Sequence, residues 1–464
     1  MRPTTGFPPG YSLSLAVFKW LGFDLHAGAR LLGGLGFSIL VLLAGVGVGA
    51  VTGSPGFGLM SAALVLGSPT LIGVHGWALS ESVFLPMSLA AILFTTGFLG
   101  TGESKYLVLG GLAVGMAALT RYAGLSLAVA LGACLALGHG NANPKRWRVM
   151  GVFAGLALGP LIVFLVRNVI VSGDLVNRPE MTWRPPEAAL IERAGAIMVS
   201  WLVPFSGVRL PGWLSTTLAG VLLLCLILGT SWGLRAVKPR PRDKTKSPAL
   251  WLLIALGTHS TTYLAVLYTS MSVADPNIRS GFSAVGERLL APVHLDLMVL
   301  IPLWLFVAWR GSEAPGRLLV IGTGLLFLVA QFSGGIKEAG ELREDGRGFN
   351  SVAWRSSAAM AYIRELPEIP IYTNEVGATY LLTGRHATFI PASYNPSTQS
   401  NRLNYSADLD RMRRTIRAGG GILAILGSGP RDRLTPEYLD ELTEGLTLVE
   451  EFGDGLIYRY TGDH

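Results

Sequence analysis

The chain has 464 residues, of which 50% are hydrophobic and only 14% are charged, and its mean hydropathy is +0.47. This composition excludes an ordinary soluble multidomain protein and indicates a polytopic membrane protein. The formal net charge of +7 would suit a nucleic-acid partner. Many of the basic residues, however, cluster in short connections between apolar runs, as they do in the cytoplasmic loops of membrane proteins. We therefore expect contacts with membrane lipids and no nucleic-acid partner.

Ten hydrophobic runs approach the roughly 20 apolar residues that a helix needs to cross a bilayer. The two runs on either side of residue 121 are short, but one helix through both would greatly exceed the bilayer thickness, so we predict two spans there. The predicted spans are 27–52, 56–75, 80–99, 105–120, 123–138, 148–171, 212–235, 249–270, 287–309 and 317–333.

The connections between the spans set their orientation. Those at 139–148 and 235–248 are rich in Lys and Arg and nearly free of acidic residues, so both are predicted to be cytoplasmic. The connections at 172–194 and 271–287 carry both signs of charge and are predicted to lie outside. By this alternation the chain enters and leaves the membrane domain on the extracytoplasmic side.

Two polar pairs stand out beside bilayer-length apolar segments. Ser80-Glu81 opens one run, and Arg121-Tyr122 separates two others. Ionisable residues are costly in such places and by default indicate a functional site that faces a cavity or an interface. The alternative is that Glu81 ends a helix among the lipid headgroups and that Arg121 extends its charge to the membrane surface.

Counting the spans places Glu81, Arg121 and Arg288 at the extracytoplasmic ends of their helices. Three independent polar interruptions on one side of the membrane favour a shared site. Other polar residues give weaker signals. His75, His259 and His294 lie on apolar runs without the spacing of metal ligands, so we predict that they pack between helices.

No metal site or disulfide framework is predicted. The two cysteines, Cys134 and Cys225, lie inside apolar runs, where a thiol behaves as a small hydrophobic group. The sequence indicates no cofactor and leaves dependence on a divalent metal open.

The last part of the chain, residues 337–464, is densely charged and has no run long enough to span a bilayer. Alternating strands and helices predict a small α/β domain there, which lies outside by the same alternation. We expect helices at 351–365, 375–382, 407–418 and 436–443 and strands at 369–373, 387–391, 421–427, 446–452 and 455–460. The predicted domains are an extracytoplasmic juxtamembrane segment (1–26), a transmembrane domain (27–333) and the extracytoplasmic α/β domain (337–464).

Four short motifs follow one another along the chain: Pro8-Pro9-Gly10-Tyr11, Ser80-Glu81, Leu119-Thr120-Arg121-Tyr122 and Glu287-Arg288-Leu289-Leu290-Ala291-Pro292. In this order they resemble the GT-C superfamily of integral-membrane glycosyltransferases, and within it the protein O-mannosyltransferase and aminoarabinose-transferase group. The tail is similar to the extracytoplasmic domain of bacterial members, in Tyr372-Thr373-Asn374 and in the segment from Tyr380 to Arg385.

The resemblance implies a mainly α, polytopic helical bundle of about ten spans with a small C-terminal α/β domain. It also implies an inverting transferase of the cell envelope, in the plasma or inner membrane. Such an enzyme moves a sugar from a polyprenyl-phosphate-linked donor to a lipid, glycan or protein acceptor on the outer face.

That chemistry needs a carboxylate as general base and cations that stabilise the departing phosphate, a role that suits arginine because its fork of donors matches phosphate geometry. Glu81 is the candidate catalytic carboxylate. The candidate phosphate-binding residues are Arg121, Arg288 and Arg279, and the supporting residues are Pro8, Pro9, Tyr11, Ser80 and Tyr122.

The chain departs from the family at its beginning. Family members place the catalytic Asp in the first extracytoplasmic loop, upstream of the Pro-Pro-Gly-Tyr segment, which here begins at residue 8. We therefore expect the native start and the catalytic Asp to lie upstream of Met1. Asp24 is predicted to be the N-cap of the next span, and the family counterparts of Glu81 support the site without having to be the base.

A second function class stays open, namely a polytopic transporter or a catalytically inactive, truncated membrane protein on the same scaffold. A transporter would favour polar groups near the bilayer midplane and weak symmetry between the two halves. The notable charges gather instead at one face, which favours the glycosyltransferase.

Overall fold

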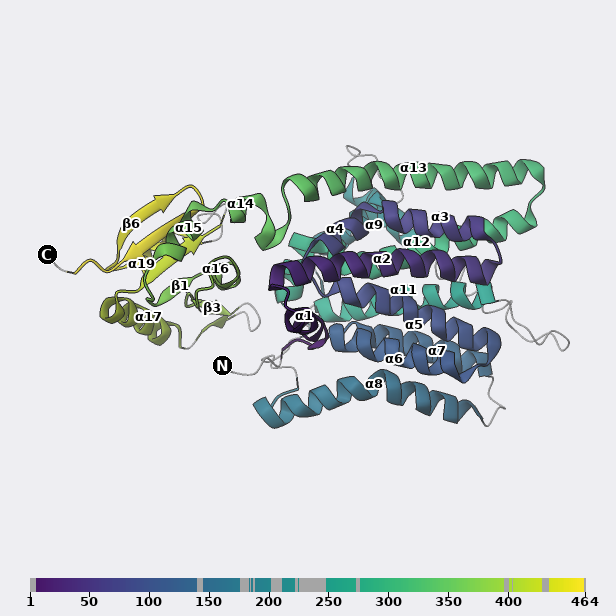
Figure 1. The fold of residues 1–464 in the computed structure, drawn as a ribbon, viewed down its shortest axis with the longest axis horizontal. Helices are drawn as coiled ribbons and strands as arrows, with labels where there is room; N and C mark the ends of the chain where they lie inside the picture. Colours follow the sequence, from purple (N-terminus) through teal and green to yellow (C-terminus); the bar gives the residue numbers. More distant parts are fainter. Residues whose placement is uncertain are drawn as a thin grey trace. The chain divides into compact units, whose positions relative to one another are not determined.

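The computed structural model divides after Gly340 into two compact units, drawn in Figure 1. Each unit is described by itself. The structure describes residues 6–139, 145–175, 183, 185–186, 188–201, 211–221, 224, 248–272, 276–395, 400–402, 404–427 and 434–462.

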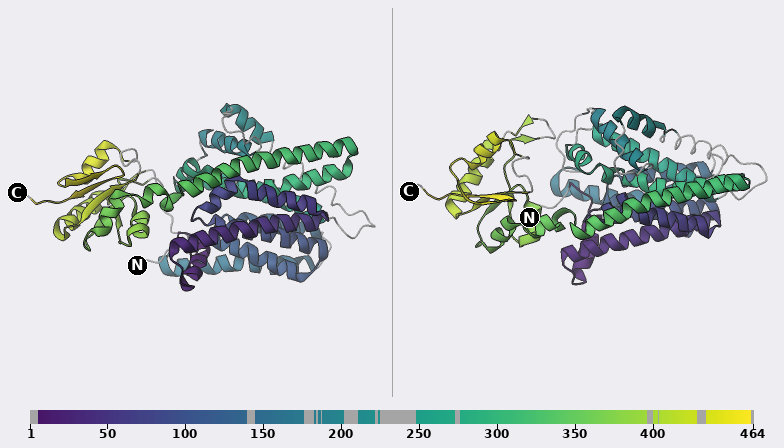
Figure 2. Two further views of the ribbon diagram at one scale, coloured as in Figure 1. Left: turned by 45° about the horizontal axis from the view of Figure 1, so that its top comes forward. Right: turned by 90° about the horizontal axis from the view of Figure 1, so that it is seen from above.

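The first unit is a bundle of helices that lie along one another, as the views in Figure 2 show. Its described helices are α1 (Gly10–Trp20), α2 (Leu25–Thr52), α3 (Pro55–Gly67), α4 (Pro69–Gly76), α5 (Glu81–Thr101), α6 (Ser104–Thr120), α7 (Gly124–His139), α8 (Lys145–Ser172), α9 (Ala188–Ser200), α11 (Pro248–Ser272), α12 (Pro276–Gly311) and α13 (Ala314–Glu344).

Within the described residues, six helices are long and apolar enough to cross a membrane: α2, α5, α8, α11, α12 and α13. Helices α3 and α4 form a seventh span if the pair, bent by 55°, is counted as one. The protein is therefore a multi-pass membrane protein, as predicted. The ten-span count stays a prediction, because α6 and α7 are shorter than 18 residues and most of 212–235 lies outside the described residues.

The spans differ in how much of their apolar surface packs inside the bundle. The most apolar stretches of α5, α11 and α12 are 67%, 61% and 83% buried, whereas those of α2, α8 and α13 are only 22 to 28% buried. Figure 1 accordingly draws α8 and α13 at opposite edges of the bundle, with α5 and α11 between them. A bilayer solvates the exposed apolar side chains of the peripheral helices, while the inner helices are placed to hold polar groups away from lipid.

One close approach fixes α2 against α5. A Cβ atom at Gly36 would lie 2.1 Å from the backbone oxygen of Ser82, so only glycine lets the two helices come this close. The contact lies one residue from Glu81, and α2 therefore supports the first turn of α5.

Several predicted boundaries need correction. Residues 276–287, predicted to be part of a loop, are the first turns of α12, which begins at a proline, a residue favoured at the first helical position. Part of the predicted outer connection at 172–194 belongs to α9. The N-terminal segment contains α1, and α13 continues to Glu344, past the predicted span end at 333.

The second unit is a small α/β fold built on a five-stranded sheet of order β2-β1-β5-β7-β6. Strand β1 (Ile371–Thr373) runs parallel to β2 (Thr388–Phe389) and to β5 (Ile422–Leu426). Strand β7 (Gly455–Arg459) pairs antiparallel with β5 and with β6 (Thr447–Phe452). A separate pair, β3 (Tyr394–Asn395) and β4 (Ser400–Asn401), is antiparallel.

Strand β5 is fully buried and separates two apolar layers, because successive side chains of a strand point to opposite faces. Ile422, Ala424 and Leu426 belong to the same core cluster as α15 (Ala358–Glu365). Leu423 and Ile425 belong to the core cluster of α17 (Tyr405–Gly419).

The predicted elements of this unit correspond closely to the observed ones. The predicted strands contain β1, β2, β5, β6 and β7, and the remaining predicted helices correspond to α16 (Val376–Thr383), α17 and α19 (Pro436–Thr443). The predicted helix 351–365 is wrong in one respect, because it is broken into α14 (Val352–Arg355) and α15. The side chain of Ser357 accepts a 3.0 Å hydrogen bond from the Met360 backbone N–H and so starts a new helix.

Candidate functional site

Three charged side chains from distant parts of the sequence meet in the bundle. Glu81 is the first residue of α5, Arg121 directly follows the last residue of α6, and Arg288 lies on α12. One carboxylate oxygen of Glu81, Oε1, accepts hydrogen bonds from Nη1 of Arg121 and from Nε of Arg288, the latter at 2.5 Å. We call these three residues the charged cluster.

The charged cluster is shielded from its surroundings but unbalanced in charge. The side chains of Glu81, Arg121 and Arg288 are 1%, 16% and 29% exposed. Two guanidinium groups and one carboxylate leave a formal charge of +1 on the three residues. A buried carboxylate is tolerated because both cations contact it, and the two guanidinium groups remain partly exposed.

The backbone around the charged cluster favours these charges. A carboxylate in the first turn of α5 and a cation at the C-terminal end of α6 both complement the helix dipoles. The Arg121 backbone N–H donates to Ala117 at 2.9 Å and closes α6. The guanidinium of Arg121 also lies over the ring of Phe84, 5.8 Å from its centre, a favourable arrangement for a cation.

Two of the predicted supporting residues lie at the charged cluster. The hydroxyl of Ser80 is 3.4 Å from Oε2 of Glu81 and 3.4 Å from Nη1 of Arg121, so both contacts are long for hydrogen bonds. Tyr122 follows Arg121 in the short link between α6 and α7, and it is half-buried.

The Pro-Pro-Gly-Tyr segment packs against the end of α6 that carries Arg121. A Cβ at Gly10 would lie 2.7 Å from the Leu119 carbonyl oxygen and 2.8 Å from the Thr120 hydroxyl. Glycine is therefore required there, and α1 rests directly on the last turn of α6.

The other residues of that segment support the same contact. Pro8 is buried, Pro9 precedes the first residue of α1, and burial raises the pKa of Tyr11 to about 12. Pro8, Pro9 and Tyr11 share no described hydrogen bond with the charged cluster.

Two more sequence predictions concern Arg279, whose role stays a prediction, and Asp24. The side chain of Arg279 lies outside the described residues, although its backbone belongs to α12. Asp24 is the N-cap of α2, as predicted, because its carboxylate accepts from the backbone N–H groups of His26 and Ala27, both at 2.9 Å. The bond from Ala27 is the main reason that the pKa of Asp24 is lowered.

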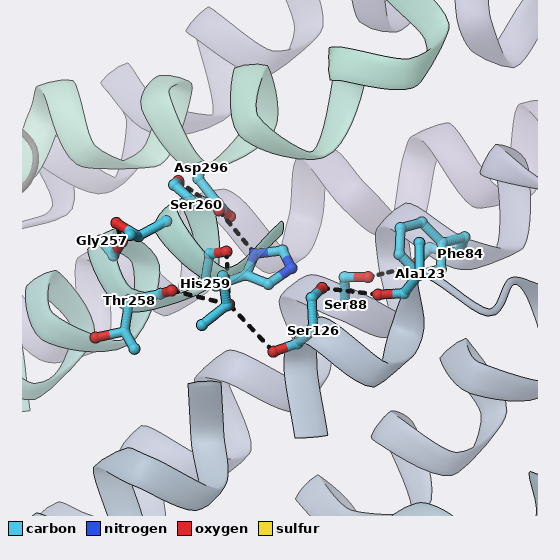
Figure 3. Close-up of polar contacts among 11 residues, drawn as sticks. Phe84, Ser88, Ala123, Ser126, Gly257, Thr258, His259, Ser260 and Asp296 are labelled. Atoms are coloured by element: carbon cyan, nitrogen blue, oxygen red, sulfur yellow. Dashed lines mark hydrogen bonds and ion pairs between the residues drawn. The ribbon is translucent and has the colours of Figure 1, made fainter. Parts of the chain in front are cut away.

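A second buried polar group was not predicted and is shown in Figure 3. Nδ1 of His259 on α11 lies 2.7 Å from Oδ2 of Asp296 on α12, and the Ser260 hydroxyl donates to the same oxygen at 2.8 Å. All three residues are 1% exposed. The available signal was Asp296 itself, a carboxylate in the middle of an apolar span.

The three histidines therefore do not share one role. His75 and His294 pack between helices as predicted. The ring of His75 lies 5.3 Å from that of Phe37 on α2, while its Nδ1 contacts the Leu71 carbonyl of its own helix at 2.8 Å. His294 Nε2 contacts the Ser68 hydroxyl at 2.7 Å. His259 differs because it pairs with a carboxylate. Within the described residues, no three His, Cys, Asp or Glu side chains are grouped closely enough to hold a metal ion.

Comparison with known proteins gives a fold assignment. The sequence matches no protein-family model and no curated protein. Among solved structures, ArnT from Cupriavidus metallidurans bound to undecaprenyl phosphate aligns with a TM-score of 0.50 and 14% identity, over 99% of this chain and 89% of that one. The transmembrane domain of the cyanobacterial bicarbonate transporter BicA aligns with a TM-score of 0.13, which is too low to indicate a common fold.

The alignment with ArnT extends over nearly all of both chains. The protein thus shares the fold of ArnT, with a helical bundle and an α/β unit in one chain.

Proposed function

We propose that the protein is a membrane glycosyltransferase that moves a sugar from a polyprenyl-phosphate-linked donor to an acceptor. Arg121 and Arg288 bind the phosphate of the donor. The observation that carries the proposal is the charged cluster, in which two guanidinium groups share a single carboxylate and leave an excess positive charge in a largely buried place.

The chemistry of the departing group explains the pair of arginines. When the sugar leaves, negative charge develops on the lipid phosphate, and fixed cations in a water-poor site stabilise that charge more than they would in water. Guanidinium groups offer paired donors that match phosphate oxygens and stay charged at any physiological pH.

Glu81 has the role of an orienting group in this proposal. Its Oε1 holds one nitrogen of each guanidinium, so both side chains are kept in place before the donor arrives. Their remaining N–H groups stay available to phosphate oxygens.

The nature of the carrier lipid and the side of the membrane complete the proposal. ArnT, which shares the fold, was solved with undecaprenyl phosphate, and this supports a polyprenyl phosphate as the carrier here. The positive-inside pattern of the sequence supports an extracytoplasmic position for the charged cluster and for the α/β unit. The acceptor is a lipid, a glycan or a protein.

The proposal is tested by binding of undecaprenyl phosphate to the purified full chain in lipid nanodiscs. Arg121→Lys should cost about 1 to 3 kcal/mol of binding, because the bidentate geometry is lost while the charge stays. Arg121→Ala and Arg288→Ala should cost more. The matched control is Arg310→Ala, an exposed arginine at the far end of α12, which should bind like the original protein.

The outcomes separate a phosphate site from a headgroup anchor. If Arg121 only anchors its helix at the membrane surface, Lys replaces it without loss, since either cation reaches the headgroups. Unchanged binding in all three well-folded variants would exclude the charged cluster from the site. For sidedness, a cysteine at Gly453 should react in intact cells with a membrane-impermeant reagent and one at Glu313 should not, in a background without Cys134 and Cys225. The reverse pattern would overturn the proposed face.

A further inference from the structure

The phenol of Tyr263 links α11 to the turn of α12 that carries Arg288. Tyr263 is 2% exposed, and its hydroxyl donates a 2.7 Å hydrogen bond to the backbone carbonyl of Leu289. This carbonyl belongs to the residue next to Arg288. The bond therefore fixes the backbone from which the guanidinium group extends.

The same turn of α12 is loosened by a proline. Pro292 lies inside the helix and has no backbone N–H, so the carbonyl of Arg288, four residues earlier, loses its ordinary partner in the helix. A proline also tilts the neighbouring carbonyl groups away from the helix axis. At this point α12 lacks one of its own hydrogen bonds, so a bond from another helix can stabilise its geometry.

A second hydrogen-bonded contact joins the same two helices. Asp296 accepts from His259 and Ser260 of α11, as Figure 3 shows. Asp296 is seven residues past Leu289, or about two helical turns. The ring of His259 meets that of Tyr263 edge to face, with 6.0 Å between their centres. Hydrogen bonds at two positions, about two helical turns apart, therefore hold α12 against α11 in one register.

From these contacts we infer that Tyr263 is a positioning residue for the phosphate site, acting through Leu289 to aim Arg288 at Glu81 and at the donor phosphate. The inference rests on the proposed function. The hydrogen bond from Tyr263 to Leu289, the residue that follows Arg288, brings the phenol close to the charged cluster. Because its proton is already donated to the Leu289 carbonyl, it acts on the arginine and does not itself hold phosphate.

Tyr263→Phe tests the inference, because the ring that packs on His259 is kept while the hydroxyl is removed. Loss of one net hydrogen bond that orients Arg288 should weaken undecaprenyl phosphate binding about three- to tenfold. The control is Tyr268→Phe on the same helix, where the tyrosine is 48% exposed. That variant should bind like the original protein.

A double-mutant cycle distinguishes positioning from a general loss of structure. If Tyr263 acts through Arg288, adding Tyr263→Phe to Arg288→Ala should weaken binding no further, whereas two independent effects would multiply. Multiplying effects would overturn the inference. A second variant, Pro292→Ala, restores the missing N–H and steadies the turn, so Tyr263→Phe should have a smaller effect in that background. An undiminished effect there would also count against it.

The two proposals fail in different ways. If Arg288→Ala binds undecaprenyl phosphate normally, the phosphate site itself is wrong. If Arg288→Ala weakens binding while Tyr263→Phe and Tyr268→Phe both bind normally, the phosphate site stands and the positioning role of Tyr263 is overturned.

Discussion

Two groups of buried ionisable side chains lie in the same bundle. They differ in their ratio of basic to acidic side chains. The charged cluster joins two cations to one anion, and its arginines are 16% and 29% exposed. The His259–Asp296 pair joins one titratable base to one carboxylate, and both side chains are 1% exposed. The first group has an excess formal charge and partly exposed cations. In the second group, which we call the self-contained pair, the Asp296 carboxylate accepts from His259 and Ser260 inside the bundle.

On the proposed function, this difference separates a binding site from a scaffold. The self-contained pair lies in a water-poor interior and contributes by holding two helices in one arrangement, because removing one partner of such a pair is costly. An incomplete cluster leaves charge that an anion offsets when it binds. The ratio of basic to acidic side chains therefore distinguishes these groups, in addition to their exposed fractions.

The largest effect should come from breaking the self-contained pair. Asp296→Ala leaves the Ser260 hydroxyl and Nδ1 of His259 buried without their acceptor, and it should lower the free energy of unfolding by about 3 to 5 kcal/mol. Thermal unfolding in detergent measures the loss. Glu103→Ala, which removes an exposed carboxylate paired with Lys105, is the control and should leave the unfolding midpoint unchanged.

A paired replacement tests whether the pair is only a scaffold. Replacing both partners with apolar residues, as in His259→Leu with Asp296→Leu, should recover much of the lost stability, because replacing a whole buried pair costs less than orphaning one partner. If undecaprenyl phosphate binding then falls far more than stability does, the pair has a direct role in the site and the comparison between the two groups is wrong.

At the charged cluster we expect a smaller loss of stability and a stronger response to the lipid. Glu81→Gln keeps an oxygen that orients the guanidinium groups but raises the formal charge from +1 to +2. Stability should fall by about 1 to 3 kcal/mol, while undecaprenyl phosphate should stabilise the variant more than it stabilises the original protein. Glu81→Ala should lose binding as well, because nothing then aims Arg121 or Arg288. Thermal shift with and without the lipid distinguishes these results, and equal loss of binding in both variants would contradict the orienting role.

The charged cluster could be predicted from the sequence, whereas the His259–Asp296 pair could not, and the reason is physical. Glu81 and Arg121 stand at the ends of apolar runs, where counting spans fixes their depth in the membrane, so their placement on one side was predictable without a structure. His259 and Asp296 lie in the middle of spans, 37 residues apart. Whether they meet depends on how each helix is rotated about its axis, and hydropathy does not determine that rotation.

The fold shows the same contrast. Features that follow from local sequence patterns were predictable, and features that depend on packing were not. Alternating apolar residues and turn signals located the strands and most helices of the α/β unit, because its burial pattern repeats along the sequence. The break at Ser356–Ser357, the early start of α12 and the bond from Tyr263 to Leu289 depend on local capping or on contacts between distant segments. The periodicity of apolar residues does not predict these features.

The smallest expected effect compares two serines, one beside each group. The Ser260 hydroxyl donates to Asp296 at 2.8 Å and is fully buried, so Ser260→Ala should cost about 1 kcal/mol of stability. Ser80 lies 3.4 Å from both of its partners in the charged cluster. Such long contacts contribute little, and Ser80→Ala should change stability by less than about 0.5 kcal/mol.

Chemical unfolding of both variants, with hydrogen exchange along α11 and α5, measures this difference. If the self-contained pair is the scaffold, exchange should speed up around Ser260 in its variant and stay unchanged around Ser80 in the other. A Ser80→Ala loss as large as that of Ser260→Ala would show that the charged cluster also holds the bundle together. In that case, the excess formal charge of the charged cluster would no longer distinguish a binding site from a scaffold in this protein.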